Sequence, residues 1–323
     1  MEAEIYRFRK GEFFLMKLSV LANLFKEKSL EETLAVTHAL GVTSVEVACC
    51  GGLCDTTEML SDKVAFYQFR ETFNAYDTAL AALSFRGNPV HPSREQAARF
   101  DTELRRTILV AELLGLDTVV TVSGCPGDKG EGVSPNWVSY ARTEEAFALL
   151  DYQWNELLVP YWKELVAFAR EHGVKHIAIE MAPGNCVFNP ETLLRLRAEV
   201  GEEIGAAVNP AELLCQGIDP VIALRVLADV LCHVYIQDLR IDAFNCAQNG
   251  LCENKRPEAL LSRSFAPRTV GYGDIKLGDL LSTLSLIGYN GPVTLVQNDL
   301  ALPTETGLAQ ALQTVTACGA IER

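Results

Sequence analysis

The sequence predicts an α/β fold, a single (β/α)8 TIM barrel over residues 16–323. Short apolar segments alternate with amphipathic stretches of helical periodicity along nearly the whole chain of 323 residues. Eight of the apolar segments are strand-like and most are followed by a helix, which implies parallel strands with right-handed crossovers. Eight such units close naturally into one barrel. An open doubly wound sheet is the alternative, but no GxGxxG follows the first strand.

The strand candidates are short runs of aliphatic and β-branched residues. They are the segments 17–21, 42–48, 78–85, 117–123, 174–181, 204–209, 232–238 and 292–297. Residues 239–275 form a longer insert with several turn-forming residues. The first 15 residues, MEAEIYRFRKGEFFL, are charged and aromatic, and we expect them to be an N-terminal extension or a result of start-codon choice.

The helix candidates lie between these strands. They are the segments 29–40, 62–77, 93–115, 145–172, 191–200, 220–230, 277–288 and 304–319. Ser29 and Ser93 precede two of them in the position of an N-cap, because a serine hydroxyl can accept a hydrogen bond from the first free amides. Gly41, Gly115 and Gly173 follow three of them, as expected where a helix ends.

Composition narrows the class of protein. The residues are 49% hydrophobic and 22% charged, which is typical of a globular domain with a large core. A net charge of −14 argues against a nucleic-acid surface, which needs clustered lysine and arginine. No apolar run reaches the ~18 residues of a membrane span, and no secretory signal is recognised. Ten cysteines without a CxxC pair indicate reduced thiols, so we expect a cytoplasmic protein.

Polar residues collect where the predicted strands end, and in such barrels this edge carries the active site. They are Ser84, Ser123, Glu180, Asn209, Asp238, Asn298 and Asp299. Glu180 is the sharpest case, since a charge at the end of an apolar strand needs a partner. It is either a metal ligand or acid/base group, or a carboxylate paired with backbone or an arginine at the rim.

Further candidates for substrate binding come from one strand and two loops. His233, Tyr235 and Gln237 share one face of the seventh strand, and His233 is as readily a core histidine as a functional one. Asn88 and His91 lie in the loop RGNPVHP. Arg268, in the loop APRTVGYGD, is either a clamp for a phosphate or hydroxyl group or part of a rim salt bridge.

Several long segments look like landmarks of one family, from about Lys17 to the last helix. They include LSFRGNPVHP, TVSGCPGD, HIAIEMAPGN, ELLCQGIDP, HVYIQD, RTVGYGD and IGYNGPVTL. With these segments the chain resembles the xylose isomerase-like TIM barrels, the sugar phosphate isomerase/epimerase family that includes inosose dehydratase and tagatose epimerase. The resemblance implies a divalent metal that polarises a sugar carbonyl and two carboxylates that move a proton through an enediolate.

The same resemblance implies that the metal site is degenerate. The family's metal-binding glutamate on the fifth strand matches Glu180. Many relatives continue with DPSHLFWQG, where this chain has NPAELLCQG, so Asn209 stands for the ligand aspartate and Glu212 for the histidine. In HVHAKD the second histidine is a ligand, and here HVYIQD places Tyr235 there. In SIEHED the first glutamate is ligand and base, and here TLVQND places Val296 there.

We therefore expect Glu180, Asn209 and Glu212 to form a weak metal site for Mn, Mg, Co or Zn, or none, with Glu180 and Glu212 as candidate catalytic carboxylates. The first hypothesis is a barrel that binds a sugar, polyol or related small molecule, in which the relatives' reaction cannot proceed as written.

An alternative is an active isomerase, epimerase or dehydratase with a site rebuilt from Glu180 and Glu212, with Asn209 and Asp238 as further candidates. A further alternative is a regulatory partner of an active paralogue. We expect no nucleic-acid or membrane partner, since few histidines and the negative charge speak against an endonuclease-IV-like barrel. Whether the chain forms a homo-oligomer is left open.

Overall fold

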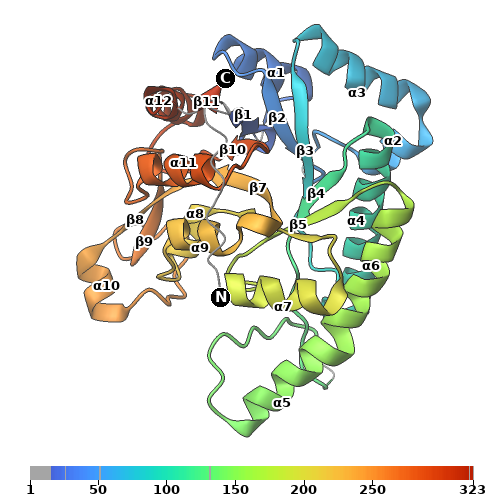
Figure 1. The fold of residues 1–323 in the computed structure, drawn as a ribbon, viewed down its shortest axis with the longest axis vertical. Coiled ribbons are helices and arrows are strands. Elements are labelled where there is room, and N and C mark those ends of the chain that lie inside the picture. The colour runs from blue at the N-terminus through green and yellow to red at the C-terminus, as the bar shows by residue number, and fades with distance from the viewer. Residues whose placement is uncertain (1–15, 26, 51, 131, 320, 323) are drawn as a thin grey trace, which may run out of the picture.

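Eight parallel strands close into a barrel surrounded by helices, as the sequence predicts (Figure 1). The computed structural model describes all residues except 1–15, 26, 51, 131, 320 and 323, so the predicted N-terminal extension lies outside the described residues. The strand order is β1-β2-β3-β4-β5-β6-β7-β10, and β10 pairs back onto β1 to close the barrel. Every pairing within the barrel is parallel.

All eight predicted strands are present, each within a few residues of its expected bounds. They are β1 (Met16–Leu21), β2 (Ser44–Ala48), β3 (Ala79–Phe85), β4 (Thr118–Thr121), β5 (His176–Glu180), β6 (Ile204–Val208), β7 (Leu231–Ile236) and β10 (Val293–Leu295). A short β11 (Ile321–Glu322) pairs with the start of β1. The insert after β7 contains an antiparallel hairpin of β8 (Asp238–Ile241) and β9 (Phe265–Arg268) that the sequence did not predict.

The helices lie outside the barrel and connect its strands (Figure 1). They are α1 (Leu30–Ala39), α2 (Thr56–Ser61), α3 (Lys63–Ala75), α4 (Arg94–Leu114), α5 (Glu144–Tyr152), α6 (Val159–Glu171), α7 (Pro190–Val200), α8 (Pro210–Leu214), α9 (Pro220–Val226), α10 (Ala243–Asn249), α11 (Leu277–Leu286) and α12 (Thr304–Ala317), with 3₁₀ turns at Ala22–Leu24 and Ala228–Val230. No helix in the described part of the chain is both long and apolar enough to cross a membrane.

The predicted caps are confirmed for α1 and for the end of α4. The Ser29 hydroxyl accepts from the Glu32 amide and the Glu32 side chain accepts from the Ser29 amide, which is a complete capping box. Gly115 has φ of 72°, so it ends α4 in the left-handed region that glycine adopts without strain. The prediction for Ser93 is wrong in its mechanism, because its side chain makes no capping bond and its amide instead donates to His91 Nδ1.

The long helix predicted over 145–172 is divided by a π-helical turn at Gln153–Leu158. Pro160 lacks the amide hydrogen that a regular helix would use at this point, which favours the altered hydrogen bonding. The turn buries the Gln153 side chain, whose Nε2 donates to the carbonyls of Pro126, Gly127 and Asn136. The loop after β4 is thereby held at the barrel mouth.

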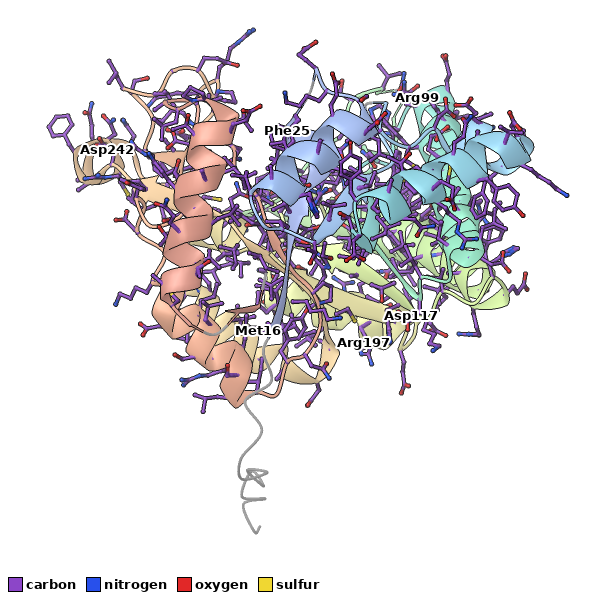
Figure 2. All side chains as sticks on the ribbon, turned by 90° about the horizontal axis from the view of Figure 1, so that it is seen from above. Met16, Phe25, Arg99, Asp117, Arg197 and Asp242 are labelled. Carbon is purple, nitrogen blue, oxygen red and sulfur yellow. The ribbon has the colours of Figure 1, made fainter. Side chains whose placement is uncertain are left out.

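The two ends of the barrel can be followed in Figure 2. Met16, at the start of β1, lies at the lower end with Asp117, which precedes β4. Phe25, which follows the end of β1, lies at the upper end with Asp242, which follows β8. The upper end therefore carries the carboxyl ends of the strands, where the sequence places the polar candidates.

Candidate functional site

A chain of buried polar groups crosses the inside of the barrel. Ser19 Oγ on β1 lies 2.7 Å from Thr294 Oγ1 on β10, and Thr294 Oγ1 lies 3.0 Å from His233 Nε2 on β7. His233 Nε2 also lies 3.0 Å from Glu46 Oε2 on β2. All four residues have 0% exposure. Because β2 and β7 are not neighbours in the barrel, the contact between Glu46 and His233 passes through its interior.

Glu46 is ionised in this setting. Burial alone would raise the pKa of its carboxyl, but the hydrogen bond and charge of His233 and the charge of Arg86 outweigh burial and lower the pKa to about 2. The interior of the barrel therefore holds an ionised carboxylate.

Tyr235 links the buried Glu46 carboxylate to Arg86. Its hydroxyl donates to Glu46 Oε1 at 3.0 Å and accepts from Arg86 Nη2 at 2.8 Å. Burial holds the pKa of the Tyr235 hydroxyl well above its ordinary value, so the group stays protonated. Tyr235 occupies the position at which the resemblance places a metal-binding histidine, and here it supports a guanidinium.

Arg86, directly after β3, places its guanidinium among the strand ends. Its Nε donates to Glu180 Oε2 at 2.6 Å, and Nη1 donates to Ser84 Oγ at 3.3 Å. The Glu46 carboxylate lies 3.9 Å from Nη2. Although burial alone would lower the pKa of Arg86, the carboxylates of Glu180 and Glu46 raise it, so the cation is permanent. Its side chain is 30% exposed.

Asn209 ties the next two strand ends to Glu180. Its Nδ2 donates to Glu180 Oε1 at 2.9 Å and to Gln237 Oε1 at 2.8 Å. Its Oδ1 accepts from the Ala211 amide at 3.1 Å, and so caps α8. These partners fix the orientation of the amide, because only the oxygen can accept from Ala211. Asn209 therefore presents hydrogens, rather than an oxygen, to the Glu180 carboxylate.

Glu212 is the carboxylate of this group that lacks a partner. It lies in α8 and is half-buried, and its side chain makes no hydrogen bond or ion pair with any described residue. Burial and the nearby charge of Glu180 raise the pKa of Glu212 to about 7, against a smaller lowering by Arg86. Near neutral pH this group can thus either give or take a proton.

These residues surround a cavity of about 670 Å³ at the carboxyl ends of the strands. Its polar side chains are mostly carboxamides, and its charged ones are one arginine and two glutamates. The carboxamides are Asn88, Gln96, Asn185, Asn209, Gln237 and Asn298, and the charged residues are Arg86, Glu180 and Glu212. Apolar lining comes from Leu21, Phe100, Val122, Pro135 and Val296. His91 and Cys125 also line it. The cavity is of a size that suits a small organic ligand.

The structure brings most of the candidates predicted from sequence to this cavity. Glu180, Asn209, Glu212 and Gln237 line it together, and Tyr235 lies beneath it. His233 is deeper still, and its Nδ1 is buried without a hydrogen-bond partner among the described residues. These residues come from three consecutive strands and the short helix after β6.

Three other candidates are engaged in holding loops or lie away from the cavity. Asn88 lines it, but its amide donates to the Cys125 carbonyl and accepts from the Cys125 amide. Asp238 accepts from four backbone amides of the β8–β9 region. Arg268 is not among the lining residues, and its Nε lies 3.4 Å from Asp299 Oδ2.

Sequence reasoning missed Glu46 and Arg86. Glu46 is a lone carboxylate inside the apolar segment VTSVEVA, the same signal that marked Glu180, so it could have been found. Arg86 directly follows a predicted strand, but nothing local indicates that its guanidinium reaches Glu180, 94 residues later. Within the described part of the chain, no group of three or more His, Cys, Asp or Glu is arranged to hold a metal ion.

Comparison with known proteins agrees with this architecture. The family model described as xylose isomerase-like TIM barrel matches residues 34–318. The uncharacterized protein YfiH of Bacillus subtilis (strain 168) is 32% identical over 306 residues, which cover 92% of this chain and 97% of that protein.

Two solved structures illustrate the likeness in fold. The xylose isomerase domain protein from Planctomyces limnophilus has a TM-score of 0.66 and 18% identity, covering 95% of this chain and 98% of that one. D-psicose 3-epimerase from Clostridium cellulolyticum H10, solved with D-tagatose, has a TM-score of 0.63 and 11% identity, covering 95% and 100%. At these identities the structures support the fold alone.

Proposed function

Because the chain belongs to the xylose isomerase-like TIM barrel family, we propose that the cavity at its barrel mouth binds an uncharged sugar or polyol without a divalent metal. The single observation that carries this proposal is the 2.6 Å contact between Arg86 Nε and Glu180 Oε2. Glu180 is the position that the resemblance assigns to an unchanged metal ligand, and its carboxylate already binds a cation that belongs to the chain.

The other donor groups fit a metal poorly. A divalent ion of this kind needs several oxygen or imidazole ligands turned toward it. Here Asn209 turns its Nδ2 toward Glu180, the Tyr235 hydroxyl is bonded to Arg86 and Glu46, and Val296 has no ligand atom. A metal placed beside Glu180 would also meet the Arg86 guanidinium at close range, and like charges repel. The residues at this barrel mouth therefore do not fit a divalent metal.

The charges around the cavity favour a neutral ligand. Arg86 is matched by Glu180 at 2.6 Å and by Glu46 at 3.9 Å, and Glu212 adds further negative charge when ionised. A phosphate or carboxylate on the ligand would meet this surplus of negative charge without a second fixed cation among the lining residues. Hydroxyl groups suit the carboxamides and the unpaired Glu212, since a hydroxyl both donates and accepts.

A second candidate function is a metal-free isomerase, epimerase or dehydratase. The observation that favours it is Glu212, a carboxyl at the cavity with a pKa of about 7 and no partner among the described residues. Such a group is suited to take a proton from a carbon next to a carbonyl and return it. Arg86 would then stabilise negative charge developing on the carbonyl oxygen.

One experiment tests both candidates. The probes are D-tagatose, D-fructose and myo-inositol, with D-tagatose 6-phosphate as the charged counterpart of the first, titrated calorimetrically into protein with and without EDTA. We expect at least one neutral probe to bind with the same Kd in EDTA, and the phosphate to bind about tenfold more weakly than its parent sugar. The same mixtures are followed by NMR for conversion of the sugar.

Conversion of a sugar that persists in EDTA would establish the metal-free enzyme. Binding without conversion would support a protein that binds the sugar but does not convert it. Binding or conversion that requires added Mn²⁺, Mg²⁺, Co²⁺ or Zn²⁺ and disappears in EDTA would contradict the proposal. Preference for the phosphorylated sugar would contradict its neutral-ligand part.

A further inference from the structure

We propose that Arg86 is the ligand-binding group of the cavity, and that its guanidinium holds oxygen atoms of the ligand where the relatives hold them with a metal. This inference rests on the proposed function, since it names the residue through which the cavity recognises its ligand. The geometry that points to it is the cation's placement, with two of its partners at positions that the resemblance assigns to metal ligands, Glu180 and Tyr235.

Arg86 has hydrogen-bonding capacity left over. A guanidinium carries five N–H groups. Three hydrogen bonds to described residues are present, to Glu180, Ser84 and Tyr235, which leaves two N–H groups on the terminal nitrogens. The side chain lines the cavity and is 30% exposed, so a ligand in the cavity can reach the guanidinium. A planar pair of donors suits two neighbouring oxygens of a sugar, such as a carbonyl and the adjacent hydroxyl.

Two further side chains that line the cavity complement the cation. Gln237 uses its Oε1 to accept from Asn209, while its Nε2 makes no hydrogen bond to a described residue and adds a donor. Glu212 adds an acceptor without a partner. A ligand hydroxyl that accepts from Arg86 can therefore donate its own hydrogen to a carboxylate of the same cavity. Donors and acceptors are both available, as a polyol requires.

The guanidinium is held in place from below. Tyr235 has 0% exposure, and its hydroxyl joins Arg86 Nη2 to the buried Glu46 carboxylate. Glu180, with 5% exposure, fixes Nε from the side. A cation held by buried partners on two sides loses little freedom when a ligand binds, which favours affinity. Tyr235 is thus a positioning residue that acts through Arg86.

The decisive variant is Arg86→Ala, tested by calorimetric titration with the neutral probe that binds the wild type. We expect the Kd to rise at least about tenfold, because charged hydrogen bonds to the ligand are lost. Added methylguanidinium should restore binding by refilling the vacated space between Glu180 and Tyr235, and added tetramethylammonium should not. Arg105→Ala removes an arginine of α4 paired with Asp101 outside the cavity, and should leave the Kd unchanged.

Tyr235→Phe keeps the ring and removes the hydroxyl that positions Arg86, and it covers the case in which Arg86→Ala does not fold. We expect it to weaken binding by roughly threefold to tenfold. If the wild type binds a neutral probe and whichever of the two variants fold bind it with the wild-type Kd, the role of Arg86 is refuted while the proposed function stands. If the wild type binds none of the probes, the proposed function fails and the inference fails with it.

Discussion

The two sides of the barrel mouth treat their carboxylates in opposite ways. On the β8–β9 side, the Asp238 carboxylate accepts hydrogen bonds from the amides of Leu239, Gly271, Gly273 and Ile275. On the β5–β6 side, Glu212 accepts none from the described residues. Both acids follow a buried strand, so the sequence alone makes them look alike. The difference teaches that convergent backbone amides make a carboxylate structural, whereas their absence leaves it without a partner.

The largest effect that separates the two sides is expected from Asp238→Ala. Four amide hydrogens, one buried and three partly buried, would lose their acceptor. Gly273 also lies against Asp238 so closely that a Cβ there would collide with the carboxylate. We expect a loss of about 3–5 kcal/mol in the free energy of unfolding, measured by urea denaturation. Glu212→Gln is the matched control and should not lower it. A loss below about 1 kcal/mol for Asp238→Ala would contradict the structural role of Asp238 and with it the difference from Glu212.

A smaller effect is expected in the pH dependence of Glu212→Gln. The pKa of Glu212 in the folded protein, about 7, is above its ordinary value of 4.5, so the folded state binds the proton more tightly. The wild type therefore loses stability relative to the variant as pH rises from 4.5 through 7. We expect Glu212→Gln to be more stable by on the order of 2 kcal/mol at a pH well above this window, and equal below it.

The measurement is a series of urea denaturations of both proteins across that range. Glu305→Gln, which removes an exposed carboxylate paired with Lys28, serves as control and should show no such trend. A stability difference between wild type and Glu212→Gln that does not change with pH would mean that Glu212 is solvated and has an ordinary pKa in the folded protein.

How far the sequence predicted this contrast depends on the range of the contacts. The eight barrel strands are short, mostly apolar runs that alternate with helical stretches, and this alternation can be recognised in the sequence. In contrast, β8 and β9 are four residues each and depend on each other for their pairing. Glu180, Asn209 and Glu212 were placed at one rim because they follow neighbouring strands. The roles of Arg86 and Glu46 depend on contacts between β2, the end of β3 and β7, which no local pattern specifies.

The smallest effect is expected from Arg268→Gln. Arg268 Nε lies 3.4 Å from Asp299, but that carboxylate also accepts from the Thr269 amide, the Thr269 hydroxyl and the Ala301 amide. Since Asp299 keeps these partners, we expect a loss below about 1 kcal/mol in the free energy of unfolding and no change in the Kd for a neutral sugar. A clear rise in that Kd would extend the ligand site to the β8–β9 side.

Because Arg86 is paired with Glu180, the positive charge at this site comes from the chain itself and not from the solution. A metal ion fills its site to a fraction that depends on its free concentration in the surroundings. A guanidinium attached to the chain is present once in every folded molecule, at a local concentration that dilution cannot lower. The positive charge at this barrel mouth is therefore part of the polypeptide, and it does not depend on the concentration of metal ions in the surrounding solution.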